Sequence, residues 1–234
     1  MIKYLISLVV GVLIGLVVLL LAIYYNPLTS TNKLSPLSVT SNNIISLNYS
    51  AVAQDMLVYT NDGESQIDPH PVKVLQLWEP PIRSTSAMVT VLSDSRGQTA
   101  GIGIKFSSQS ERTSLLDGEA LMDTAWHIYL PARGSLFVEQ TENYWGFLRE
   151  IVIPAHWSSG DNWRGKWRGN ITSGPGALGT AFVAGGSGEL AGVDTDAVEA
   201  LSAQAYSVEH GPVAILGELS IEIPGEEVDY AETE

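Results

Sequence analysis

The stretch from Thr195 to Ile223, TDAVEALSAQAYSVEHGPVAILGELSIEI, contains two long strand-like runs separated only by the turn HGP. In the second run, Val213–Ile223, the odd positions are apolar or glycine, whereas positions 218, 220 and 222 are Glu, Ser and Glu. A period of two residues is the pattern of a strand with one buried face. The runs Thr195–Glu209 and Val213–Ile223 therefore predict an antiparallel hairpin at the end of the domain.

The same period dominates the chain upstream, from about Ile44 onward. Turn sequences such as DSRG, PARG and SGPG separate the strand-like segments. Because many strands are joined by short turns and no clear amphipathic helix interrupts them, the sequence predicts an all-β antiparallel meander that closes into a barrel and so hides its edges. The predicted domain covers residues 44–224. Its further strands are Ala87–Leu92, Ala100–Phe106, Glu119–Leu130, Ser135–Gln140, Tyr144–Ile153, Asn162–Ile171 and Thr180–Ala184.

Alternation within these strands also predicts which side chains face the barrel interior. In Glu119–Leu130 the apolar positions include Trp126, and His127 falls on the opposite, exposed face. In Tyr144–Ile153 the apolar parity is interrupted by Arg149. A charged residue at a core position must be paired, solvated or directed at a ligand, because burying an isolated charge is very unfavourable.

Two interpretations of Arg149 follow. Either it forms a structural salt bridge or a bulge turns it outward, or it is a cation in a cavity suited to an amphipathic acid. The residues predicted to bind such a ligand are Trp126, Trp145, Phe147, Arg149 and Tyr206.

The N-terminal run Leu5–Ile23, LISLVVGVLIGLVVLLLAI, carries no charge. At about 1.5 Å per residue it nearly spans the ~30 Å hydrocarbon core of a bilayer. Residues 1–26 are therefore predicted to be an uncleaved membrane anchor, with a cleaved signal peptide as the alternative. The position of Lys3 before the run predicts a cytoplasmic N-terminus and a periplasmic or otherwise extracytoplasmic domain. Residues 27–43 read as a linker, and the acidic residues 225–234 as a disordered tail.

Composition excludes several classes of function. The chain of 234 residues has no cysteine, so disulfides, thiolate chemistry and Cys-ligated metals are absent. A formal net charge of −14 argues against nucleic-acid binding, which needs clustered Lys and Arg. The four histidines are scattered without metal-ligand spacing. The sequence predicts no cofactor and no metal site.

A Gly-rich segment carries a resemblance to a known family. The run GTAFVAGGSGELAG, Gly179–Gly192, resembles the turn G-T-x-x-x-x-G-G-T-G-x-F-x-G of the allene oxide cyclase and dirigent-like barrels, with Ser187 in place of Thr and Leu190 in place of Phe. The resemblance extends over about Ser86 to Pro224. It implies an eight-stranded, calycin-like barrel with an apolar cavity, whose members guide the cyclisation or coupling of hydrophobic substrates, often as oligomers. No catalytic residue of the family matches a position of this sequence.

Three hypotheses of function follow from these observations. The domain is a tethered barrel that binds an apolar or amphipathic small molecule, a cyclase or isomerase of the allene oxide cyclase type, or a docking subunit of a larger membrane assembly. Self-association of the chain is compatible with each of them. A cavity inside the barrel favours the first two over the third, and ionisable groups that converge in that cavity favour an enzyme over a binder.

Overall fold

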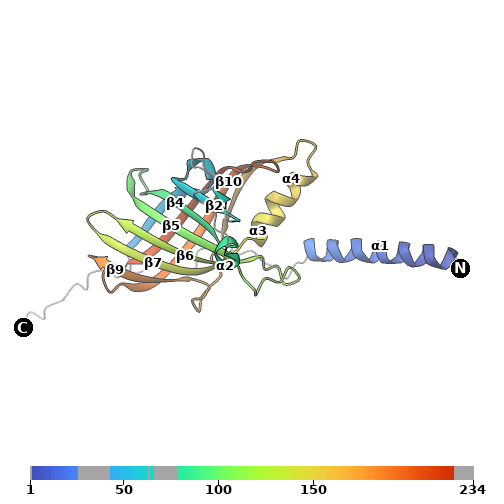
Figure 1. Ribbon diagram of the computed structural model, residues 1–234, viewed down its shortest axis with the longest axis horizontal. Helices are drawn as coiled ribbons and strands as arrows, with labels where there is room; N and C mark the ends of the chain where they lie inside the picture. Colours follow the sequence, from blue (N-terminus) through green and yellow to red (C-terminus); the bar gives the residue numbers. More distant parts are fainter. Residues whose placement is uncertain (1, 26–42, 63, 66–78, 224–234) are drawn as a thin grey trace, which may run out of the picture.

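The computed structural model describes residues 2–25, 43–62, 64–65 and 79–223. It consists of an N-terminal helix and a predominantly β domain (Figure 1). Within the described residues, helix α1 (Ile2–Tyr24) is long and apolar enough to cross a membrane, and none of its residues is buried in the protein. All of the predicted linker 27–43 except Asn43, and the whole of the predicted tail 225–234, lie outside the described residues.

The strands of the domain are antiparallel, and short helices interrupt them. The strands are β1 (Asn43–Ser50), β2 (Val58–Asn61), β3 (Glu64–Ser65), β4 (Ser86–Ser93), β5 (Thr99–Gln109), β6 (Leu121–Leu130), β7 (Gly134–Asn143), β8 (Asn162–Asn170), β9 (Ala181–Gly188), β10 (Asp194–Ser207) and β11 (Gly211–Ile223). The helical elements after α1 are η1 (Ala53–Asp55), α2 (Pro80–Arg83), α3 (Trp145–Phe147), η3 (Leu148–Val152) and α4 (Ile153–Trp157).

The sheet closes on itself. Its strand order is β1-β11-β10-β9-β7-β6-β5-β4, and β4 pairs back to β1 through Asn48 and Ser93. This closure confirms the predicted all-β barrel, with eight strands in the ring. The predicted hairpin is β10–β11, whose register runs from Ala197 opposite Ile221 to Ser207 opposite Gly211. Strand β9 pairs with the first part of β10 and β8 with its second part, so two strands in turn complete that side of the barrel.

The strand predicted over Tyr144–Ile153 is wrong, because the chain is helical from Trp145 onward. Residues 145–157 form one continuous helical segment of α3, the π-helical turn η3 and α4. Apolar residues four apart, such as Phe147 and Ile151, lie on one face of a helix as well as on one face of a strand, and the short run fits both periods. Ile151 is fully buried in a cluster with Ile171, Leu201, Ala203 and Ile215, and this packing favours the helix.

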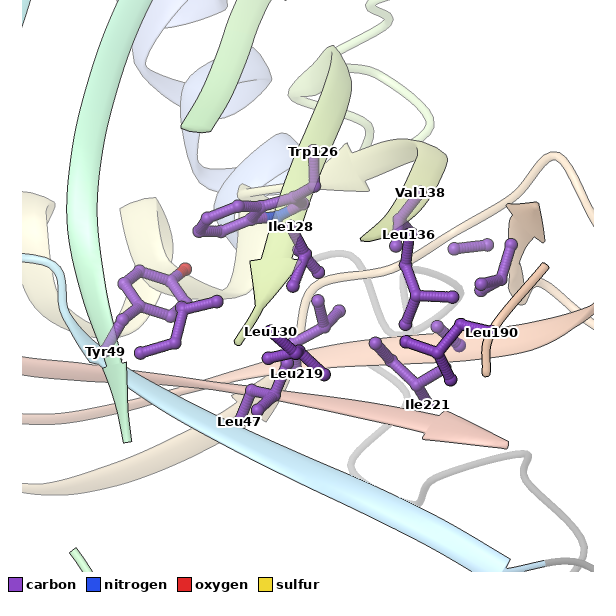
Figure 2. Close-up of a cluster of buried hydrophobic side chains, with 14 of the residues drawn as sticks. Leu47, Tyr49, Trp126, Ile128, Leu130, Leu136, Val138, Leu190, Leu219 and Ile221 are labelled. Atoms are coloured by element: carbon purple, nitrogen blue, oxygen red, sulfur yellow. The ribbon is translucent and has the colours of Figure 1, made fainter. Parts of the chain in front are cut away.

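A hydrophobic core fills one end of the barrel (Figure 2). Tyr49 and Trp126 meet edge to face, with ring centroids 5.1 Å apart, and form one boundary of this core. Tyr49 lies opposite Gly217 on β11, where a Cβ atom would stand 2.1 Å from its ring. Glycine is required there because the ring occupies the space of a side chain. The other fully buried core residues include Leu47, Leu92, Ile128, Leu136, Leu219 and Ile221.

The two ends of the barrel differ. The helical end carries α2, the loop 110–120 and the segment 144–157, and α1 extends away from this end (Figure 1). The far end carries the turns 94–98, 131–133 and 189–193. Most of the core cluster occupies the far half, and its members Tyr49, Met56 and Met88 border a cavity in the helical half.

Candidate functional site

An ion cluster lies inside the barrel. The ammonium Nζ of Lys105 on β5 lies 2.5 Å from Oε1 of Glu142 on β7 and 2.7 Å from Oε1 of Glu199 on β10. Both carboxylates are fully buried, and the Lys105 side chain is 6% exposed. Three ionisable groups from three strands therefore converge in the barrel interior.

Neutral donors complete the shell of the two carboxylates. Glu199 accepts hydrogen bonds from the Tyr49 hydroxyl, from Trp126 Nε1 at 3.0 Å and from the Gln140 amide. Glu142 accepts from the Tyr144 hydroxyl at 2.8 Å, from Gln140 Nε2 at 2.7 Å and from Thr124 Oγ1 at 3.1 Å. Buried charges are tolerated only with such partners.

Strand alternation and one threonine set this geometry. Lys105 follows Gly101 and Gly103 on the inner face of β5, and Gln140 and Glu142 are two residues apart on the inner face of β7. Thr172 Oγ1 accepts the backbone N–H of Glu199 at 2.7 Å and donates to Gln140 Oε1 at 2.9 Å. Because the carbonyl oxygen of Gln140 is held in this way, its NH₂ group is directed at both carboxylates.

The two carboxyl groups of the cluster have pKa values shifted in opposite directions. Burial and the negative charge of Glu199 raise the pKa of Glu142 from 4.5 to about 7, although Lys105 opposes this shift. Burial also acts to raise the pKa of Glu199, but the charge of Lys105 and the hydrogen bonds from Lys105, Tyr49 and Trp126 outweigh it, so this pKa is lowered. One cation between two carboxylates leaves one negative charge in excess, and Glu142 is the group that takes up the neutralising proton.

The other groups of the cluster keep their protons. Burial acts to lower the pKa of Lys105, but Glu142 and Glu199 outweigh it and raise this pKa. Burial and the neighbouring carboxylates raise the pKa of Tyr49 and of Tyr144 well above the usual value, so both are neutral phenols. At neutral pH the interior thus offers hydrogen-bond donors fixed in a site of low dielectric constant.

A cavity of about 670 Å³ lies in the helical half of the barrel, next to the cluster. Lys105, Tyr49 and Tyr144 line it and form its polar floor. The volume is in the range of small-molecule sites, which are mostly apolar with a few directed polar groups. Its apolar lining includes Met56, Tyr59, Met88, Leu121, Phe147, Leu148, Leu201 and Ile215.

The structure brings together only part of the predicted ligand site. Phe147 lines the cavity, and Tyr206 packs against it with ring centroids 6.0 Å apart. Trp126 is buried beneath the cavity floor, where it binds Glu199, and Trp145 is buried on α3.

The strand alternation predicts Arg149 at a core position of a strand, and the structure does not place it there. It lies on η3 and pairs with its neighbour Glu150 at 3.0 Å, which corresponds to the salt-bridge interpretation. Arg149 is not among the residues that line the cavity. The polar groups that do line it were missed, and the cation is Lys105.

A second groove, of about 770 Å³, lies on the outer face of β5, β6, β7 and β9. The outward side chains of Phe106, Phe137 and Phe182 line it, and each is about half exposed. His127, which is exposed as predicted, stacks on Phe137 with ring centroids 4.6 Å apart. Thr124, Trp126 and Gln140, whose side chains bind the ion cluster, also border this groove. The docking hypothesis stays a prediction.

Comparisons with known proteins add little to this geometry. No protein-family model matches the sequence, and no curated protein matches it either. Two solved structures align over 80% of this chain with low TM-scores. One is the Diels Alderase AbmU from Streptomyces koyangensis, at 12% identity over 72% of that chain and a TM-score of 0.35. The other is a nonspecific heme-binding cyclase that catalyzes a 4 + 2 cycloaddition during neoabyssomicin biosynthesis, at 11% identity over 70% of that chain and a TM-score of 0.33.

These likenesses are too weak to carry an argument about activity. The resemblance of the Gly179–Gly192 turn to the allene oxide cyclase and dirigent-like barrels also stays a prediction. The function is therefore argued from the cavity and the cluster alone.

Proposed function

We propose that the barrel binds an apolar small molecule that carries one hydrogen-bond acceptor. The observation that carries this proposal is the position of Lys105, Tyr49 and Tyr144 on the wall of a mostly apolar cavity of about 670 Å³. The Lys105 ammonium has a third N–H beyond its bonds to Glu142 and Glu199, and the Tyr144 hydrogen becomes available when Glu142 is protonated. These two donors select a carbonyl or another oxygen acceptor.

The charge of the cluster refines this choice. With Glu142 protonated, Lys105 and Glu199 cancel, and with Glu142 ionised the cluster carries one net negative charge. Neither state favours an anionic ligand at the floor. The sequence predicts a ligand with an acidic group beside Arg149. We propose instead a ligand whose polar group is a neutral acceptor.

Photochemical capture of benzophenone, a neutral aromatic ketone, tests this proposal on the full chain. We expect the ketone to crosslink to cavity residues such as Met56 and Met88. Tyr144→Phe removes one hydrogen bond of about 0.5–1.5 kcal/mol and is expected to weaken capture by about two- to tenfold. Tyr129→Phe, at a half-exposed position on the outer wall, is the matched control and is expected to leave capture unchanged. Equal capture by both variants, or labelling only on the outer groove, would contradict the proposal.

A cyclase or isomerase is the second candidate function, and the proton on Glu142 favours it. When Glu142 is protonated it can donate to the Tyr144 oxygen, 2.8 Å away, which releases the Tyr144 hydrogen toward the cavity. A carbonyl bound there would receive a donor fixed in an apolar site, and negative charge developing on its oxygen would be stabilised. The apolar walls would hold the rest of the substrate in a folded conformation. No covalent bond to the protein is formed in this scheme.

We further propose that α1 anchors the chain in a membrane, with a cytoplasmic N-terminus and an extracytoplasmic barrel. The length and apolar composition of α1 support this proposal. Because the chain has no cysteine, single cysteines report topology cleanly. In intact cells, a membrane-impermeant maleimide is expected to label Ser95→Cys and to spare Ile2→Cys, which keeps Lys3 in place. The reverse pattern, or a mature chain that begins after Tyr25, would refute the anchored topology.

A further inference from the structure

We infer that the helical end of the barrel rests on the bilayer, so that the cavity takes its ligand from the membrane. This inference rests on the proposed function, because it names the source of the ligand for the same cavity. It follows from the place at which α1 meets the barrel.

The last turn of α1 contacts the segment 144–157. The Tyr24 hydroxyl lies 3.5 Å from the carbonyl oxygen of Arg149, and the Tyr24 ring lies 5.6 Å from the ring of Trp157. Tyr25 packs edge to face on Tyr24 at 4.8 Å, and both Tyr25 and Trp157 are about 70% exposed. Tyr and Trp gathered at the end of a spanning helix are typical of the membrane–water interface.

The same segment forms part of the cavity wall. Phe147 and Leu148 line the cavity, and so does Leu115 from the loop 110–120. Figure 1 shows α1 pointing away from this end of the barrel rather than lying along its wall. If α1 crosses the bilayer, the residues around the cavity are those nearest to the lipid surface.

The helical end exposes large apolar side chains, whereas the turns at the far end expose charged ones. At the helical end, Ile82 on α2 is 48% exposed and Leu116 in the loop 110–120 is 61% exposed. In the described part of the chain, the far-end turns 94–98, 131–133 and 189–193 expose no large apolar side chain and present Arg96, Arg133 and Glu189. An exposed apolar surface marks an interaction site. Here it lies at the end of the barrel that α1 contacts, which points to lipid as the partner.

The contact is apolar rather than electrostatic. Asp117 and Arg112 lie in the loop that carries Leu116, and the chain has a formal net charge of −14. Arg83, Arg112 and Arg149 at this end each pair with a carboxylate of the chain, so the surface gains little from anionic headgroups. The expected partner is therefore the acyl boundary of a neutral bilayer, and the ligand is a lipophilic molecule that partitions there.

Site-directed labelling of the full chain in phosphatidylcholine vesicles tests this orientation. Nitrobenzoxadiazole is attached to Ile82→Cys, Leu116→Cys or, as the far-end control, Ser95→Cys, and spin-labelled phosphatidylcholine is the quencher. We expect quenching at positions 82 and 116 to be several times that at position 95. Addition of phosphatidylserine is expected to leave this ratio unchanged.

Equal quenching at the three positions, or quenching at the helical end that needs phosphatidylserine, would overturn the inference. Benzophenone capture in the same vesicles separates it from the proposed function. If positions 82 and 116 are quenched but cavity residues are not crosslinked, the barrel rests on lipid and the proposed binding function fails. If cavity residues are crosslinked and quenching is equal at both ends, binding stands and the membrane source of the ligand is refuted.

Discussion

Replacing Lys105 with methionine is expected to lower the free energy of unfolding by about 3–5 kcal/mol, the typical cost of leaving buried charges without their partner. In this variant the carboxylates of Glu142 and Glu199, both fully buried, lose their shared cation. The measurement is chemical denaturation of the full chain in detergent, followed by the intrinsic tryptophan fluorescence, to which the buried Trp126 contributes. The variant is expected to regain stability as the pH falls, since the two carboxylates then take up protons.

Arg168→Met is the matched control. Arg168 pairs with Glu218 at 2.6 Å, about as closely as Lys105 pairs with its partners, but its side chain is 66% exposed. Exposed ion pairs contribute about 0–1 kcal/mol, so the difference between the two variants isolates the effect of burial. If Lys105→Met fails to fold, the triple variant Lys105→Met, Glu142→Gln, Glu199→Gln is expected to restore folding, because no charge is left buried. Similar losses for Lys105→Met and Arg168→Met would contradict the buried cluster.

The free energy of unfolding is expected to fall as the pH rises from about 4.5 to about 7. The pKa of Glu142 is about 7 in the folded chain and 4.5 in the reference state, so the folded state holds an additional proton between these values. Stability that depends on this proton is fully present below pH 4.5 and is lost as the pH passes the folded pKa. At about 1.4 kcal/mol per pKa unit, the full change is on the order of 3 kcal/mol.

Glu142→Gln is expected to flatten this pH dependence, because the amide does not titrate. Glu139→Gln is the control, since Glu139 lies three residues earlier on β7 with its side chain exposed on the outer wall. Ligand capture is expected to depend on protonation of Glu142 as well. Benzophenone capture is expected to fall above pH 7 in the natural chain and to become independent of pH in Glu142→Gln. A slope that persists in Glu142→Gln would assign the titration to another group.

Much of the fold could be predicted from the sequence because strands with one buried face repeat every two residues. The hairpin β10–β11 and the inward face of β6, with Trp126 and Ile128 buried, follow directly from this period. The segment 144–157 did not follow, because its apolar residues fit a helical face equally well. Its packing on Ile171 and Leu201 decides between the two, and these contacts are distant in sequence.

The candidate site was hidden for a different reason. In β5 the large apolar residues Ile102 and Phe106 face outward, and the inner face carries Gly103 and Lys105. A rule that places apolar residues inside the barrel therefore predicts that Lys105 faces solvent, whereas it faces the interior. Glu142 and Glu199 come from strands that meet Lys105 only when the barrel closes. The inner parity Gly-x-Gly-x-Lys of residues 101–105 is the one local signal of a polar interior.

The packed core at the far end also determines how molecules move through the barrel. With Leu47, Ile128 and Leu219 fully buried across that end, the interior is a blind chamber rather than a passage. Under the proposed function, a molecule that enters at the helical end must leave by the same opening, so it must depart before the next one binds. Occupancy is then sequential, and any product too bulky or too lipophilic to leave quickly competes directly with the incoming molecule.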